Sequence, residues 1–346
     1  KGDYITIEGF VITNDKAKGI GINAGEAHRG TAVKGCQMIG NYIHDLSGTG
    51  IHTGTNGIAK NNRIQNVGRG FFANSGSLVA GNEVDTLIPQ YETKNGKSKV
   101  KKTQYCFFNG DDITFRGNYL HGTEEKYLIE GMGVCFFSTY DAWIYSPSHN
   151  ILMENNRCFN ATHASEPSGT AQKKSSKFIY RNNLFVNTVY VGVYCQAVSE
   201  IIVENNTFIN CGAYPVWFQS KRETQGSVVR NNIIAYYDRD RVVKEFGWKQ
   251  PDAGIRNNLH PGDPVETSHN LMWKTQNRDY SSTDFVADPL FVDPANNDFR
   301  LKPGSPAINA GATLVDVKTD LRNVTRPQDG KYDIGAYEYT AKEDVK

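Results

Sequence analysis

Three predicted loop segments of this sequence, 109–112, 138–143 and the inserted segment 163–166, carry carboxylates whose side chains could do acid–base chemistry. Two carboxylates that flank a glycosidic bond can cleave it, because one protonates the leaving oxygen while the other activates water or attacks the anomeric carbon. Aromatic surroundings would raise the pKa of the acid. The candidate catalytic residues are Asp111, Asp112, Tyr140, Asp141, His163 and Glu166. The alternative for the aspartates is structural, since aspartate after glycine is common in turns and an Asp-Asp pair can cap a corner.

A second set of residues fits β-elimination from a uronate polymer. That reaction neutralises a carboxylate with Ca²⁺ or arginine and removes a proton with Lys, Arg, Tyr or His. Lys221 and Arg222 end one predicted strand, and Tyr194 and His163 are further candidate bases. The basic segment 94–102 would steer an acidic polymer, although such a run is equally typical of a solvated loop. Ca²⁺ is the cofactor of this alternative alone, and no other cofactor is indicated.

The elements that must position these residues are marked by a recurring asparagine. It returns every 20 to 38 residues and always follows Gly or Asn. An apolar residue stands three positions before it and another two positions after it. Such a period with fixed inward positions is the signature of stacked repeats. The repeated residues are Asn41, Asn62, Asn82, Asn118, Asn156, Asn183, Asn206 and Asn232.

One period, residues 199–220, predicts the structure of a turn. Three short apolar strands are separated by Asn205-Asn206 and by a bend at 211–215. The pattern predicts an all-β, right-handed, single-stranded parallel β-helix of about nine to ten turns and three sheets. The corner asparagine tolerates the left-handed backbone, and its amide can bond to the asparagines above and below. A second polar column follows four residues later, at Asp45, Asn66, Thr86, Asn160, Asn187 and Asn210.

Alignment of the third strands predicts a column of mostly aromatic residues that points outward. Long insertions border this column, and insertions gathered on one face of a repeat protein mark its binding face. Aromatic faces beside amides suit sugar rings, which offer both apolar faces and hydroxyls. The alternative is that the loops cover the column and bury it as a second core. The predicted substrate-binding residues are His52, Phe72, Phe107, Phe136, Trp143, Tyr194, Trp217, Gln219, Lys221 and Arg222.

The overall composition of the sequence narrows the classes of function that it could serve. The net charge is +1, which gives no electrostatic case for nucleic acid or an anionic membrane. No apolar run reaches membrane-spanning length. Six cysteines lack metal-binding spacing, so buried thiols are expected, with a Cys106–Cys135 disulfide between stacked turns as the alternative. The sequence runs almost directly from Lys1 into a predicted strand, so we expect a mature or trimmed form of the protein. We also expect a monomer.

The tail departs from the repeat. Its segments 285–294, 298–308, 326–327 and 333–339 resemble the C-terminal part of many secreted bacterial right-handed parallel β-helix proteins of the carbohydrate-active type. The resemblance, together with the Asn turns, covers nearly the whole chain. It implies a β-helix over 1–275 and an irregular cap over 276–346, whose charged residues close the last turn. It also implies a secreted, periplasmic or cell-surface protein with a polysaccharide or oligosaccharide partner.

Three functional hypotheses therefore stay open. The first is a glycoside hydrolase that uses a carboxylate pair, and the second is a polysaccharide lyase. The third is a non-catalytic glycan-binding or surface module. Clustered carboxylates in consecutive turns favour the first hypothesis, whereas the basic segment favours the second. The catalytic motifs of chondroitinase B, alginate epimerases and polygalacturonases are absent from the sequence, which keeps the third hypothesis open.

Overall fold

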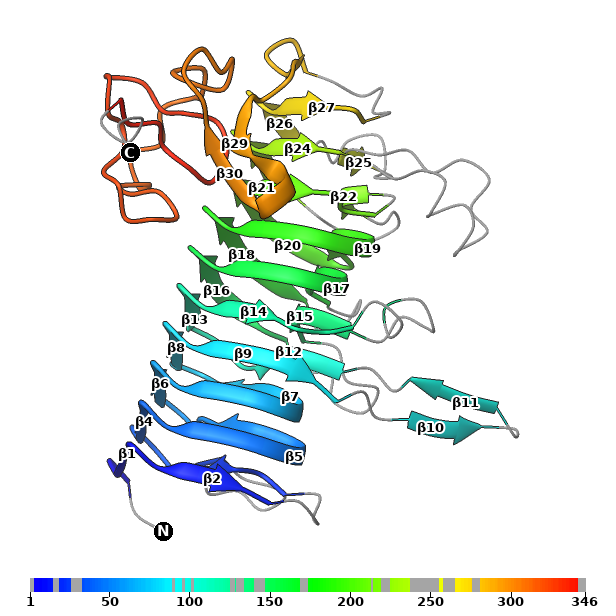
Figure 1. Cartoon of the computed structure of the whole chain (residues 1–346), viewed down its shortest axis with the longest axis vertical. Coiled ribbons are helices and arrows are strands. Elements are labelled where there is room, and N and C mark those ends of the chain that lie inside the picture. The colour runs from blue at the N-terminus through cyan, green and yellow to red at the C-terminus, as the bar shows by residue number, and fades with distance from the viewer. Residues whose placement is uncertain are drawn as a thin grey trace.

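The chain winds into a right-handed parallel β-helix whose turns stack along the long axis of the molecule (Figure 1). The fold is seen in a computed structural model. It describes residues 3–14, 19–25, 33–88, 91–94, 97–100, 103–124, 128, 134–139, 147–168, 174–212, 214–218, 225–236, 255–257, 265–275 and 281–341.

One face of the solenoid is a ten-stranded sheet whose described pairs are all parallel. Each turn contributes one strand, so the sheet marks ten turns, within the predicted nine to ten. Its strands in order are β1 (Thr6–Glu8), β4 (Gln37–Ile39), β6 (Ile58–Lys60), β8 (Leu78–Ala80), β13 (Ile113–Arg116), β16 (His149–Glu154), β18 (Ser175–Arg181), β20 (Val198–Glu204), β23 (Val228–Arg230) and β26 (Glu266–Ser268).

The predicted second and third sheets form one continuous 16-stranded sheet. In four turns the two predicted strands are a single long strand: β5 (Tyr42–His52), β7 (Arg63–Asn74), β17 (Arg157–Glu166) and β19 (Leu184–Cys195). The other strands of this sheet are β2 (Val11–Thr13), β3 (Ile22–Asn23), β9 (Glu83–Leu87), β12 (Thr103–Asn109), β14 (Tyr119–His121), β15 (Val134–Ser138), β21 (Thr207–Ile209), β22 (Tyr214–Phe218), β24 (Ile233–Ala235), β25 (Ile255–Asn257), β27 (Leu271–Trp273) and β28 (Phe285–Val286).

The long strands bend without breaking because one residue in each adopts a left-handed backbone. That residue belongs to the second polar column predicted from the sequence. Asparagine, aspartate and glycine adopt this conformation at the least cost. The column has φ between +50° and +87° at Asp45, Asn66, Thr86, Gly122, Asn160, Asn187 and Asn210.

The left-handed residue at the main corner is not the repeated asparagine itself, as the sequence predicted, but the residue before it. Its φ lies between +52° and +64° in every described turn from Gly40 to His269. This geometry explains why Gly or Asn almost always precedes the repeated asparagine. The residues at this position are Gly40, Asn61, Gly81, Gly117, Asn155, Asn182, Asn205, Asn231 and His269.

The repeated asparagines form a buried ladder of side-chain amides along the corner. In a typical rung, Asn156 Nδ2 donates to Phe115 O at 3.0 Å and to Asn183 Oδ1 at 2.9 Å. Its Oδ1 accepts hydrogen bonds from Asn118 N at 3.0 Å and Asn118 Nδ2 at 2.9 Å. The predicted bonding between stacked asparagines is thus confirmed. The ladder continues through Asn270 and ends at Asp284, which accepts from both Asn270 N and Asn270 Nδ2.

Aromatic and aliphatic side chains fill the interior of the solenoid. Phe115 stacks obliquely against Phe108 at 5.4 Å and against Phe137 at 5.3 Å between ring centroids. All six cysteines are buried and free, so the expected thiols are present and the Cys106–Cys135 disulfide is not. The two Cys-Phe-Phe triplets are offset by two residues, because Cys106 pairs with Phe137. Burial raises the pKa of the Cys106 thiol well above its ordinary value.

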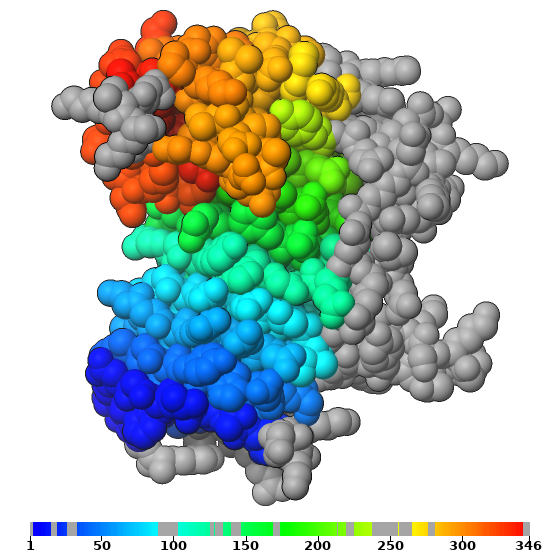
Figure 2. Space-filling model, in the orientation of Figure 1, coloured from blue at the N-terminus to red at the C-terminus, as the bar shows by residue number. Residues whose placement is uncertain are grey.

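The tail packs along the side of the solenoid, beside the corners of its later turns (Figures 1 and 2). It contains an antiparallel pair, β29 (Phe291–Asp293) and β30 (Asp298–Leu301), joined through the 3₁₀ helix η1 (Pro294–Asn296). Side-chain amides of three corner residues donate to backbone carbonyls of the tail. These are Asn182 to Thr319, Asn205 to Asp333 and Asn231 to Ala312. The left-handed corner residues therefore also anchor the tail.

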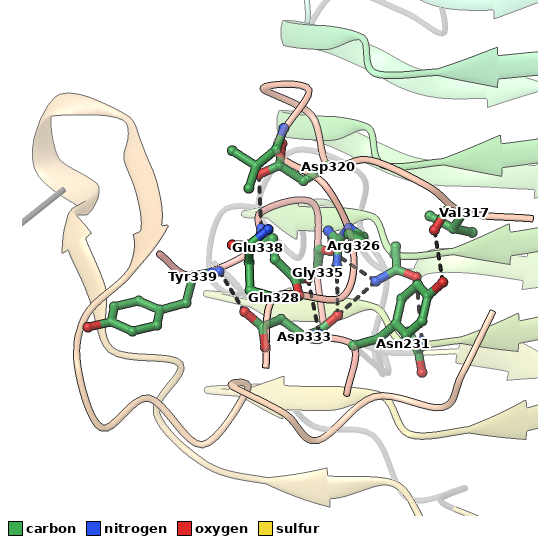
Figure 3. Close-up of polar contacts among 12 residues, drawn as sticks. Asn231, Val317, Asp320, Arg326, Gln328, Asp333, Gly335, Glu338 and Tyr339 are labelled. Atoms are coloured by element: carbon green, nitrogen blue, oxygen red, sulfur yellow. Dashed lines mark hydrogen bonds and ion pairs between the residues drawn. The ribbon is translucent and has the colours of Figure 1, made fainter. Parts of the chain in front are cut away.

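A buried ion pair organises the tail itself (Figure 3). Arg326 Nη1 donates to Glu338 Oε2 at 2.9 Å, and both side chains are almost fully buried. Arg326 also donates to the carbonyls of Asp333 and Gly335, at 2.9 and 2.7 Å. Burial raises the pKa of Glu338 to about 7, and the positive charge of Arg326 opposes that rise.

We expect Arg326→Ala to destabilise the protein by about 3–5 kcal/mol, because it leaves a buried carboxylate without its charge partner and removes one donor from each of two buried carbonyls. Denaturant unfolding at pH 7 measures the loss. Arg63→Ala, which removes an exposed arginine from a turn far from the tail, is the control and should cost under about 0.5 kcal/mol. Equal stability of the two variants would contradict the structural role of the pair.

Candidate functional site

Strand register defines the outward column on the 16-stranded sheet. Paired residues on adjacent strands run from His52 to Phe72, then to Phe107, Ser138 and Glu166. Ser165 pairs with Val193, so Glu166 and Tyr194 are the next neighbours, and Tyr194 pairs with Trp217. Adjacent strands lie ~4.8 Å apart, so this column is a continuous line of side chains. Its members are His52, Phe72, Phe107, Ser138, Glu166, Tyr194 and Trp217.

Phe136 was predicted in this column, and that prediction is wrong. The two-residue offset of β15 against β12 puts Ser138 at the outward position. Phe136 instead joins the core, where its ring lies 5.3 Å from Tyr105 and 6.4 Å from Phe185.

The segment 163–166 was predicted to be an inserted loop, and this is also wrong. It continues β17, in register with β15 on one side and β19 on the other. Because the segment is a strand, Glu166 joins the column directly, and His163 lies three residues earlier on the same strand. Both side chains are buried, at 8% and 1% exposure respectively.

The N-terminal half of the column is largely closed to solvent. His52 stacks on Phe72 with ring centroids 4.1 Å apart and an interplanar angle of 5°. Phe72 meets Phe107 edge-on at 4.8 Å, and the Arg69 guanidinium lies 4.6 Å from the Phe107 ring centre. His52 and Phe107 are 3% and 0% exposed. Burial lowers the pKa of His52, while its hydrogen bond to Asn74 opposes the shift. In these turns the column forms a second core, the alternative considered from the sequence.

The C-terminal half carries four aromatic side chains that we call the aromatic platform: Tyr190, Tyr194, Tyr214 and Trp217. The Trp217 ring lies 4.7 Å from Tyr194 and 5.1 Å from Tyr214. Tyr190, Tyr194 and Trp217 are only half-buried, so part of each side chain is accessible. Tyr190 and Tyr214 were missed from the sequence. They lie in the segments just before the aligned strands, and the Val191–Tyr214 pair brings both segments to the same face.

A carboxylate and an imidazole border the aromatic platform. The His163 ring lies 5.0 Å from Tyr190 and 6.4 Å from Tyr194. Burial raises the pKa of Tyr194 to about 12, and the nearby Tyr190 and Glu166 side chains add to the effect. Burial and the nearby Glu166 also raise the pKa of Tyr190. Both phenols therefore stay protonated near neutral pH and can donate hydrogen bonds.

Asp111 and Asp112 lie at a corner between β12 and β13, where both accept hydrogen bonds from the next turn of the solenoid. Asp111 Oδ1 accepts from the backbone N of His149 at 2.8 Å. Asp112 has φ +58°, and its Oδ1 accepts from Asn150 Nδ2 at 2.6 Å. These contacts fit the structural alternative, a corner cap, and neither residue belongs to the outward column. Their catalytic assignment stays a prediction without support from this geometry.

Several predicted residues lie outside the described part of the chain. They are Tyr140, Asp141, Trp143, Gln219, Lys221 and Arg222. In the basic segment 94–102, the backbone forms an antiparallel hairpin of β10 (Tyr91–Lys94) and β11 (Lys97–Val100).

Among the described residues, no group of three or more His, Cys, Asp or Glu residues is placed to hold a metal ion. No helix in this described part of the chain is long and apolar enough to cross a membrane.

Residues 86–244 match the model of a family described as "Periplasmic copper-binding protein (NosD)". The described residues do not fit a copper site, because they hold no metal-ligating cluster and the cysteines in the matched region are buried. No curated protein sequence matches the chain.

Several solved structures are similar to the chain at low sequence identity. The complex of XylC with xylose has a TM-score of 0.56 at 12% identity, covering 98% of this chain and 65% of that one. Pectate lyase Pel9A has a TM-score of 0.42 at 11% identity, covering 95% and 88%. The PL6 family alginate lyase AlyGC has a TM-score of 0.32 at 12% identity, covering 84% and 51%. The chain thus spans about two thirds of XylC, and the likeness establishes the parallel β-helix fold.

Proposed function

We propose that this protein binds a polysaccharide at the aromatic platform and cleaves its glycosidic bonds with Glu166 as the proton-transferring group. The observation that carries the proposal is a nearly buried carboxylate in line with half-exposed aromatic rings. The fold is shared with XylC, whose structure contains xylose, and this supports a sugar as the ligand. A secreted or periplasmic location suits such a substrate.

The platform offers the two kinds of contact that a sugar ring needs. The faces of Tyr194 and Trp217 can pack against the apolar C–H faces of successive sugar rings. The protonated hydroxyls of Tyr190 and Tyr194 can donate to sugar hydroxyls or to the glycosidic oxygen. Aromatic anchors with a few placed polar groups are typical of small-molecule and cofactor sites.

Glu166 would protonate the leaving oxygen of the sugar bound across the platform. Its low exposure keeps bulk water from competing for the proton. Hydrolysis by a carboxylate pair also requires a second carboxylate to activate water or attack the anomeric carbon. Asp141 is the predicted partner, on the chain just after β15, whose Ser138 pairs with Glu166.

The products separate hydrolysis from β-elimination. We expect reducing ends to be released from at least one member of a polysaccharide panel without absorbance near 235 nm. Strong absorbance at that wavelength would indicate unsaturated products, and a lyase would then replace the hydrolase. Binding without any cleavage would contradict both enzymatic mechanisms and leave a glycan-binding module.

Trp217→Ala is expected to weaken oligosaccharide binding by about tenfold or more, because one stacked aromatic face contributes roughly 0.5–1.5 kcal/mol beyond its buried area. Isothermal titration calorimetry with the best ligand of the panel measures the change. Trp273→Ala is the matched control. Trp273 is also half-buried, but it packs against the apolar cluster between the solenoid and the tail, which includes Leu271 and Phe291. Equal losses in the two variants would contradict the assignment of the platform.

A further inference from the structure

A cleft of about 660 Å³ lies where the tail meets the side of the solenoid, away from the aromatic platform. Its solenoid wall includes the ends of β8 and β13 and the start of β17, and its tail wall includes the start of β30. Figure 2 shows the tail, orange to red, standing beside the green and teal turns. The volume is in the range of small-molecule binding sites.

Four arginines from distant parts of the sequence line this cleft, against a single lining carboxylate, Asp298. The arginines are Arg116, Arg157, Arg300 and Arg322. Arg300 binds Asp298 in a two-pronged pair, with Nε 2.9 Å from Oδ1 and Nη2 2.6 Å from Oδ2. That pair neutralises one of the four positive charges, and Arg322 is paired as well, with its Nε 3.5 Å from Asp320 Oδ2.

The two arginines of the solenoid wall are the most accessible. Arg116 pairs with Glu154 of the neighbouring strand but remains 54% exposed. Arg157 is exposed and lies over the Tyr119 ring at 4.7 Å, and no carboxylate of the described residues forms an ion pair with it.

Tyr337 and Arg322 complete the tail wall with a neutral donor and a fixed cation. Burial raises the pKa of Tyr337 to about 12, so the phenol stays protonated. Arg322 lies near the Tyr337 ring and donates to Glu338 O at 3.1 Å, which holds its guanidinium in place. With Glu154 beside Arg116, Asp298 beside Arg300 and Asp320 beside Arg322, the cleft keeps one excess positive charge. Its guanidinium groups are preorganised, an arrangement that suits an anionic ligand.

We infer that this cleft is a second binding site, for the carboxylate or sulfate groups of an acidic oligosaccharide. Guanidinium groups pair with such planar or tetrahedral anions through two parallel hydrogen bonds. Arginines on both walls could engage successive charged sugars of one chain. The inference rests on the proposed function only for the choice of a sugar as the carrier of the anions.

Calorimetry on the full chain tests the site with three probes: an oligogalacturonate, a sulfated oligosaccharide and a neutral xylo-oligosaccharide. The double variant Arg116→Gln/Arg157→Gln should bind at least one acidic probe about tenfold or more weakly than the wild type, because it removes two guanidinium groups that form charge-assisted hydrogen bonds. Its binding of the neutral probe should not change. Binding of the acidic probe by the wild type should weaken as salt is raised.

Arg63→Gln is the matched control. Arg63 directly follows a ladder asparagine, as Arg157 does, and lies over the Tyr42 ring at 5.4 Å, but it is outside the cleft. Its substitution should leave acidic binding unchanged. The inference is overturned if the wild type binds neither acidic probe, if the double variant keeps full affinity, or if Arg63→Gln loses as much. Loss of acidic binding in Trp217→Ala but not in the double variant would also overturn it. Failure of the proposed function would be seen separately, because Trp217→Ala would then bind the neutral xylo-oligosaccharide with the same affinity as the wild type.

Discussion

Replacing Asn156 with alanine is expected to lower the free energy of unfolding by about 3–6 kcal/mol, more than any other single side-chain truncation proposed for this protein. Asn156 lies mid-ladder and has no exposed surface. The change would leave Asn118 N without its acceptor and Phe115 O without its side-chain donor. It would also remove one partner of Asn118 Nδ2. Each buried polar group left unsatisfied costs about 1–3 kcal/mol.

Denaturant unfolding followed by circular dichroism measures this loss. Asn23→Ala is the control, because Asn23 is exposed and its Oδ1 accepts a local bond from Gly25 N. It should change stability by under about 0.5 kcal/mol. A loss below about 1 kcal/mol for Asn156→Ala would mean that water or a shifted backbone replaces the amide, and the ladder would not be a main source of stability.

The ladder has a direction, which explains both of its ends. Every member donates from its backbone N and Nδ2 toward the next member on the C-terminal side. The last position therefore needs only an acceptor, and the carboxylate of Asp284 fills it. At the other end, Asn41 Oδ1 accepts from the backbone N of Phe10, which has no side-chain amide to offer.

The β-helix was predictable from the sequence because its corners impose strict chemistry. A left-handed residue followed by a fully hydrogen-bonded amide admits few residue types, so the asparagine period appears plainly. The residue that adopts the left-handed backbone was misassigned by one position. Side-chain bonding and backbone strain fall on adjacent residues, and the sequence pattern alone does not say which residue does which.

The outward column was predicted with one error of register. Two Cys-Phe-Phe triplets suggested a direct alignment of Cys106 with Cys135, whereas Cys106 pairs with Phe137. A shift of two residues preserves the alternation of inward and outward positions, so hydrophobic pattern could not detect it. For the same reason, the hydrophobic pattern could not identify Ser138 as a member of the column. Glu166 was not assigned to the column because residues 163–166 were predicted to form a loop.

The largest expected effect on activity comes from Glu166→Gln, which should reduce glycosidic cleavage by about 10²–10⁴-fold. Glutamine keeps the shape of the side chain but cannot transfer a proton. Oligosaccharide binding should change little, because the aromatic platform is intact. The rate of reducing-end release and the dissociation constant, measured on the same ligand, separate the two effects.

Glu83→Gln is the matched control, since Glu83 lies on β9 outside the column and pairs with His121 at 3.0 Å. It should keep wild-type cleavage, whereas Glu166→Asp should recover part of the activity lost in Glu166→Gln, because a carboxyl group is restored one methylene short. If Glu166→Gln cleaves at the wild-type rate while remaining folded, the proton must come from another group. Asp141 would then be the next residue to change, since it follows β15, the strand whose Ser138 pairs with Glu166.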